Sequence, residues 1–65
     1  MNITVNGTPT DVAATDLSTV LVELGHGEDR VATAVNEAFV PAGARAGHVL
    51  RPGDRLEILA PRQGG

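Results

Sequence analysis

The sequence predicts a small α+β domain in which one helix packs on one face of a mixed β-sheet. The chain has 65 residues, of which 42% are hydrophobic, a composition that suits one compact core and excludes a disordered chain. An Asn-Gly turn predicts an early hairpin, and one helical stripe and three further strand-like segments follow it. We therefore expect a sheet of four to five strands over residues 1–61, with a flexible tail over 62–65.

Local turn chemistry predicts the first hairpin. Residues 3–5 alternate between apolar and polar side chains, as a half-buried strand does, and Asn6-Gly7 follows directly. Asn and Gly both tolerate the positive φ that a type I′ turn requires. The partner strand is expected over residues 8–13, with Pro9 near its start, where no amide donor is needed.

A single amphipathic helix is predicted after the hairpin. Its N-cap is Thr15 or Asp16, since either side chain can accept a hydrogen bond from the first helical turn. Gly25 suits a left-handed C-cap, and Gly27 is a second helix breaker. The apolar stripe recurs at i, i+3, i+4 and i+7 and consists of Leu17, Val20, Leu21 and Leu24.

Two strands joined by a tight turn are expected in the middle of the chain. Residues 30–36 are mostly apolar, as in a central strand, and Asn36-Glu37 suits a turn into a short strand over residues 38–40. Pro41 ends that strand. Both alternating sets of positions in 30–36 are largely apolar, so either face of this strand can be turned toward the core.

The last strand follows a Gly-rich connection. Residues 42–50 are expected to form a short turn or 3₁₀ segment, with Val49 and Leu50 filling the core. Residues 52–54 have the sequence Pro-Gly-Asp, which is typical of a turn. Residues 55–60 then alternate, as a strand with two different faces does. One face carries Leu56, Ile58 and Ala60, and the other carries Arg55, Glu57 and Leu59.

Composition and charge argue against several classes of function. The net charge of −3 argues against a nucleic-acid partner. No apolar run approaches the roughly 20 residues that span a bilayer, and the opening residues lack the pattern of a signal peptide, so we expect no membrane partner. Cysteine is absent, which removes disulfides and thiolate zinc sites. A cytoplasmic protein is expected.

A catalytic or metal centre is not expected either. A deep pocket is hard to build in so small a chain, and Ser18, the single serine, has no plausible triad around it. His26 and His48 fall in separate loops without a metal-ligand spacing and are expected to be solvated. A Gly-Lys-Ser/Thr phosphate loop is absent, so any ATP must be bound by a partner. A carrier, modifier or binding module is the expected class.

The C-terminal Gly64-Gly65 is the strongest functional feature. Glycine lacks Cβ, so this tail can thread a narrow channel and bring the Gly65 carboxylate to a nucleotide bound by a partner. Beside the tail, Leu59 is a candidate for an apolar docking patch together with Phe39 or Val40. The alternative for Leu59 is that it covers a second, minor core.

The chain resembles, nearly from end to end, the ThiS family, the small β-grasp (ubiquitin-like) sulfur carriers of thiamine biosynthesis, and three segments carry the resemblance. They are residues 2–7, residues 31–36 with 39–41, and residues 53–65. The last is the most specific, because a Gly-Asp-Arg-Leu-Glu-Ile strand runs into a Gln-Gly-Gly end. Residues 42–47 depart from the family, whose members often have bulkier or charged side chains there.

The resemblance implies a β-grasp fold and a carrier without its own catalytic site or bound cofactor. A ThiF-like, E1-related adenylyltransferase would use ATP to adenylate the Gly65 carboxylate. A persulfide, supplied through a cysteine desulfurase and a sulfur relay, would then replace AMP and leave a thiocarboxylate. A thiazole synthase would take the sulfur. Gly64 would be the threading spacer, and Arg62 and Gln63 would contact the partners.

Other classes of function remain open from the sequence. The small subunit of molybdopterin synthase shares the fold and the Gly-Gly end, although it is usually longer and has a Pro-Pro pair before the tail, and carriers for cysteine synthesis are also similar. A ubiquitin-like protein modifier would join Gly65 to target lysines. This chain has no lysine, so it cannot form isopeptide chains of itself. A plain interaction module with an inert tail is the last alternative.

Overall fold

A five-stranded sheet and a single α-helix make up the fold. The computed structural model describes residues 1–28 and 30–60. Its elements in chain order are β1 (Asn2–Val5), β2 (Thr8–Asp11), α1 (Leu17–Glu23), β3 (Ala32–Val35), β4 (Ala38–Val40), the 3₁₀ helix η1 (Ala42–Gly47) and β5 (Arg55–Leu59). The predicted 3₁₀ segment between the last two strands is confirmed.

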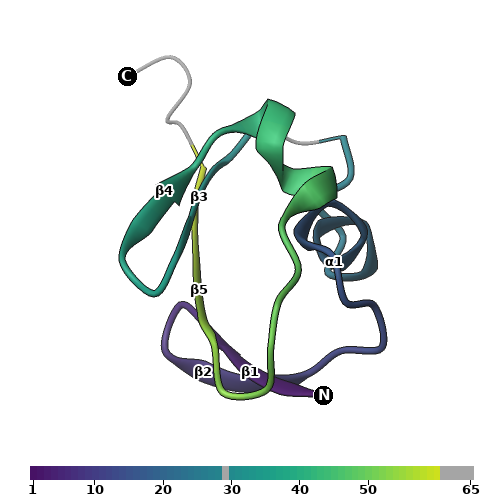
Figure 1. The fold of residues 1–65 in the computed structure, drawn as a ribbon, viewed down its shortest axis with the longest axis vertical. Helices are drawn as coiled ribbons and strands as arrows, with labels where there is room; N and C mark the ends of the chain where they lie inside the picture. Colours follow the sequence, from purple (N-terminus) through teal and green to yellow (C-terminus); the bar gives the residue numbers. More distant parts are fainter. Residues whose placement is uncertain (29, 61–65) are drawn as a thin grey trace.

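The strands form one mixed sheet in the order β2-β1-β5-β3-β4. The pair β1 and β5 is parallel, and the other neighbouring pairs are antiparallel. Figure 1 shows α1 beside one face of this sheet, with β4 and η1 at the end of the molecule toward which β5 runs. The α+β class and the β-grasp arrangement are confirmed. No helix in the described part of the chain is long and apolar enough to cross a membrane.

The first hairpin has the predicted turn and a shorter second strand. Asn6 and Gly7 have φ of 50° and 85°, as a type I′ turn requires. The second strand ends at Asp11, two residues before the predicted limit. The reason is that the Glu23 carboxylate accepts the backbone N–H groups of Ala13 and Ala14 at 2.8 and 3.0 Å, so these groups turn away from the sheet.

Helix α1 begins and ends as the sequence predicts. Asp16 is the N-cap, and its carboxylate accepts the backbone N–H of Thr19 at 2.9 Å, which decides between the two predicted candidates. Leu24 is the C-cap, and Gly25 follows it at φ 90°. The helix buries its apolar stripe against the sheet through Leu17, Val20 and Leu21.

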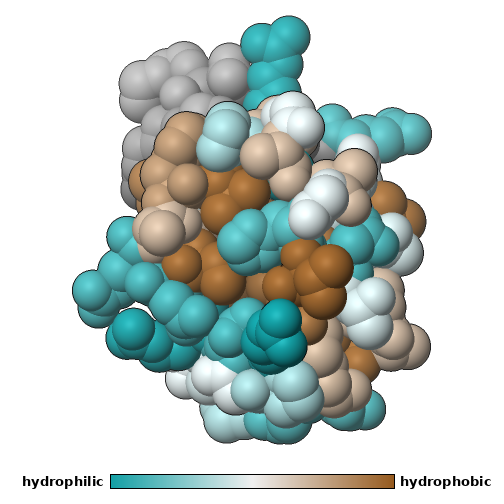
Figure 2. Space-filling view, in the orientation of Figure 1, coloured by the Kyte–Doolittle hydropathy of each residue, from teal (hydrophilic) through white to brown (hydrophobic). Residues whose placement is uncertain are grey.

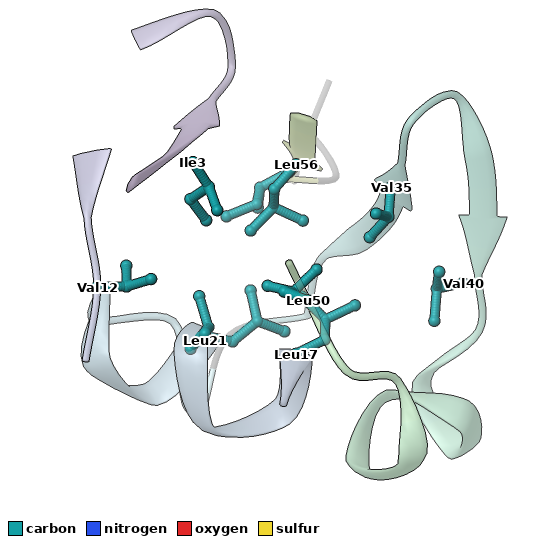
Figure 3. Packing of buried hydrophobic residues seen from close by; sticks show 10 residues of the cluster. Ile3, Val12, Leu17, Leu21, Val35, Val40, Leu50 and Leu56 are labelled. Atoms are coloured by element: carbon teal, nitrogen blue, oxygen red, sulfur yellow. The ribbon is translucent and has the colours of Figure 1, made fainter. Parts of the chain in front are cut away.

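The core fills the space between the helix and the inner face of the sheet. Thr33 and Val35 of β3 face it, which settles the face that the sequence left open. Leu56 and Ile58 are buried as predicted, whereas Ala60 lies past the end of β5 and is exposed. Figure 3 shows the side chains of the two layers meeting; its labelled residues are Ile3, Val12, Leu17, Leu21, Val35, Val40, Leu50 and Leu56.

One prediction for the connection before β5 is wrong. Leu50 is buried as expected, but Val49 is 60% exposed. The backbone here is extended, because Val49 forms an isolated bridge with Asp16 and Leu50 N–H donates to Thr15 O at 2.7 Å. Neighbouring side chains of an extended backbone point to opposite sides, so only one of the two can enter the core.

Acid should destabilise the fold because three carboxylates act as backbone acceptors. Bonds to Ala14 and Ala13 lower the pKa of Glu23, and the Arg51 N–H and Asn36 amide lower that of Asp54. The Thr19 bond lowers the pKa of Asp16. The folded state therefore binds fewer protons than the unfolded state, and this stabilisation disappears as the pH falls through the folded pKa values. We expect a lower Tm at pH 3 than at pH 7, followed by circular dichroism.

The variant Glu23→Gln tests the contribution of one of these carboxylates. Its neutral amide does not titrate, so its Tm should be lower than that of the wild type at pH 7 and should fall less between pH 7 and pH 3. If the Tm falls by the same amount between pH 7 and pH 3 in Glu23→Gln and in the wild type, Glu23 does not contribute to the acid sensitivity.

Candidate functional site

The candidate site surrounds the C-terminal end of β5. This strand lies at the centre of the sheet, between β1 and β3, and its pairing with β3 extends to Leu59, so β3 fixes the point where the strand ends. The predicted tail residues Arg62, Gln63, Gly64 and Gly65 lie outside the described residues, as does Pro61. The last described residue, Ala60, marks the point from which the tail leaves the domain.

An apolar patch lies on the outer face of the sheet next to this point. Leu59 of β5 pairs with Ala32 of β3, and Ala34 of β3 pairs with Phe39 of β4. Phe39 is 68% exposed and Leu59 is 72% exposed, so Leu59 does not cover a second core. These four residues are called the outer patch. Val40, the alternative to Phe39 in the predicted patch, is buried in the core and does not belong to this surface. In Figure 2, hydrophobic surface lies over β4, where hydrophilic residues border it.

Small residues make this face concave. The side chains of Ala32 and Ala34 form a shallow floor, and Phe39 and Leu59 stand higher beside it. They border a hollow of about 580 Å³ that is also lined by Asn6, Thr33, Glu57 and Ile58. No ion pair is formed by the exposed Glu57 carboxylate within residues 1–28 and 30–60. A partner that fills the hollow would therefore meet apolar surface with a negative charge at its side.

Asn6 holds β5 next to the hollow, a role that turn propensity did not reveal. Its side-chain Oδ1 accepts the N–H of Ile58 at 2.8 Å, and its Nδ2 donates to Ile58 O at 3.1 Å. The amide thus replaces a strand partner where β1 has already ended. The strand that carries the tail is paired almost to its last residue. The sequence shows only that an Asn stands at a turn. It does not show that Asn6 bonds Ile58, because the two residues lie 52 positions apart.

The family comparison extends from the domain through the tail. The model of the ThiS family matches residues 3–65, which include Gly64 and Gly65. The chain belongs to the ThiS family. A search of curated proteins gives no match.

Two solved structures are similar to this ThiS-family chain over its full length. One is the crystal structure of a thiamine biosynthesis protein (ThiS) from Geobacter metallireducens, with 28% sequence identity, a TM-score of 0.84 and complete coverage of both chains. The other is an NMR solution structure of a thiamine biosynthesis protein from the same organism. It has 28% identity and a TM-score of 0.80, and the alignment covers all of this chain and 88% of the other.

The two histidines of the ThiS-family chain do not form a site. Both lie in loops and are half-buried, so they are only partly exposed to the solvent that the sequence predicts around them. Backbone hydrogen bonds hold both segments in place: His26 N–H donates to Leu21 O at 2.7 Å, and His48 O accepts the N–H of Leu17 at 2.9 Å. Within the described ranges, no three His, Cys, Asp or Glu side chains come close enough to hold a metal ion.

Proposed function

We propose that this chain is a sulfur carrier of thiamine biosynthesis and that its Gly65 carboxylate holds the sulfur as a thiocarboxylate. The observation that supports this best is the ThiS family match, because it includes the Gly-Gly end as well as the domain. The similar structures from Geobacter metallireducens, which are described as thiamine biosynthesis proteins, support the pathway. We place the reaction in the cytoplasm, where ATP is supplied.

The proposed cycle begins with activation of the carboxylate. A carboxylate is a poor acyl donor, so Gly65 attacks the α-phosphate of ATP in an adenylating partner, and pyrophosphate leaves. The outer sulfur of a persulfide then attacks the acyl carbon, and AMP leaves. A second thiol cleaves the resulting acyl disulfide, which yields the thiocarboxylate and a disulfide. A thiazole synthase transfers the sulfur to its substrate, and an oxygen from that substrate or from water replaces it, which returns the carboxylate.

In this cycle the chain contributes a folded domain that the partners bind and a tail that carries the sulfur, and it supplies no catalytic group. Gly64 provides the narrow spacer, and Arg62 and Gln63 make contacts within the partner's channel. Binding of the folded domain holds the tail at the partner's active site, which raises the effective concentration of the reacting carboxylate. The outer patch lies beside the start of the tail, so we assign it to docking of the ThiF-like partner and the thiazole synthase.

Truncation of the outer patch should weaken docking without unfolding the chain. Phe39→Ala and Leu59→Ala are each expected to raise the KM for the carrier in ATP–pyrophosphate exchange about tenfold, because aromatic and apolar anchors carry much of an interface's energy. Both side chains are exposed, so the Tm should change little. Val49→Ala is the matched control, since it truncates another exposed apolar side chain that lies away from the patch. Unchanged KM values for both patch variants would place docking elsewhere.

Deletion of the gene tests the pathway. The deleted strain should require thiamine, and the full chain should restore growth, whereas a chain without Gly64-Gly65 should not. Growth without thiamine would contradict the proposal. A ladder of high-mass conjugates in an immunoblot, together with thiamine-independent growth, would support a protein modifier instead.

A further inference from the structure

The side chain of Arg45 in η1 crosses to the start of β3 at the end of the sheet where the tail leaves. Its Nη2 donates to Val31 O at 2.5 Å, and its Nε donates to Thr33 Oγ1 at 3.0 Å. Since Ala32 pairs with Leu59, the same register carried one residue further sets Val31 opposite Ala60. The guanidinium group therefore lies at the edge of the domain around Val31 and Ala60, from which the tail starts. This edge is called the rim.

The position of this guanidinium group is fixed. Thr33 is the buried polar side chain of the described core, and its hydroxyl donates to Val40 O at 2.8 Å while it accepts from Arg45. The guanidinium group thus connects η1, β3 and β4. Arg45 as a whole is half-buried, so the direction of its side chain is set by packing as well as by hydrogen bonds.

The hydrogen bonds of Arg45 do not neutralise its charge. Both of its partners are neutral oxygens, and no carboxylate of residues 1–28 and 30–60 pairs with it. An arginine has five N–H donors, and two of them are used here. A pre-oriented cation with free donors matches the planar, two-oxygen geometry of a carboxylate.

Any protein that activates the tail must cover this rim. Five residues beyond Ala60 span at most about 17 Å, so a nucleotide that receives Gly65 lies close to the domain. The outer patch and Arg45 flank the start of the tail on opposite faces of the sheet, because Thr33 points inward while Phe39 and Leu59 point outward. A partner that surrounds the tail meets an apolar surface on one side and a cation on the other.

We propose that Arg45 is the docking anchor for an acidic side chain of the adenylating partner, on the side of the tail opposite the outer patch. This inference rests on the proposed function, because it names a contact of the same partner. It assigns Arg45 a role in positioning the tail and no part in the chemistry.

The test is ATP–pyrophosphate exchange with the adenylating protein of the same organism, measured against carrier concentration at several salt concentrations. Arg45→Gln should raise the KM for the carrier about tenfold, leave kcat nearly unchanged and flatten the salt dependence of KM. Arg45→Lys keeps the charge and should retain most of that salt dependence. Arg51→Gln is the matched control, because Arg51 is exposed in the turn at the other end of the sheet, beside Asn2.

A second variant distinguishes a contact between Arg45 and the partner from a purely structural role of Arg45 within this chain. Thr33→Val removes one hydrogen-bond partner of Arg45 but keeps its charge, so it should lower the Tm and leave the salt dependence of KM intact. If Thr33→Val and Arg45→Gln raise KM equally, with unchanged salt dependence in both, Arg45 is only a structural brace and the proposal fails. If Arg45→Gln changes the KM for ATP and leaves the KM for the carrier unchanged, the proposal is also overturned. The anion bound by Arg45 would then be a phosphate of ATP and not an acidic side chain of the partner. A wild-type chain that supports no exchange at all would instead refute the proposed function.

Discussion

A chain that lacks Gly65 should form the thiocarboxylate at least about a hundredfold more slowly while keeping its fold. Deletion shortens the tail by one residue, so the carboxylate of Gly64 would stop about 3.5 Å short of the position that Gly65 reaches. Misplacement of a reacting group by even 1 Å can lower a rate about a hundredfold. The measurement is the initial rate of thiocarboxylate formation by intact mass, with ATP, the adenylating partner and a persulfide donor.

Gly43→Ala is the control for this deletion. It also removes a glycine, but a Cβ at position 43 meets no atom within 4 Å and the residue does not have positive φ. Both variants should have the circular dichroism spectrum of the wild type, and Gly43→Ala should have its rate as well. A Gly65-deleted chain that reacts at the wild-type rate would show that the terminal carboxylate is not the sulfur acceptor.

Leu56→Ala should cost more stability than any surface change in the molecule. Leu56 is 1% exposed and lies in the central strand, in the middle of the core. Truncating a buried leucine costs about 2 to 5 kcal/mol. A domain of this length is stabilised by only about 3 to 10 kcal/mol, so much of the variant should be unfolded at 37 °C. Urea unfolding followed by circular dichroism measures this, since the chain has no Trp or Tyr to provide fluorescence.

Leu59→Ala provides the matched control, because it is the same substitution in the same strand at a side chain that is 72% exposed. Its free energy of unfolding should stay within about 0.5 kcal/mol of the wild type. Equal losses for Leu56→Ala and Leu59→Ala would contradict the burial pattern of β5. The two variants also separate stability from docking, since only Leu59→Ala should weaken partner binding while the chain remains folded.

Features set by neighbouring residues could be predicted from the sequence. Asn6-Gly7 defines its turn because few residues accept positive φ, and Asp16 caps a helix that begins directly after it. The alternation of residues 55–60 predicted which side of β5 carries Leu59. In each case the deciding interaction spans only a few positions along the chain.

Features set by distant contacts could not be predicted in this way. The face of β3 depends on its pairing with β4 and β5, since small apolar residues occupy both sides. Val49 is apolar but exposed, because the bridge to Asp16 fixes the direction of its backbone. Arg45 and Asn6 looked like loop and turn residues, and their partners lie 12 to 52 positions away. The sulfur-carrying role proposed for Gly65 rests on the resemblance to a family and on no contact that the structure describes.

The mass of the chain isolated from its own cells tests the central claim most directly. The proposal predicts a fraction of molecules heavier by the exchange of one oxygen for sulfur, with the change located at Gly65. Incubation with ATP, the adenylating partner and a persulfide donor should increase that fraction, and the thiazole synthase with its substrates should remove it. An unchanged mass in the presence of a demonstrably active adenylating partner would contradict the sulfur-carrier function.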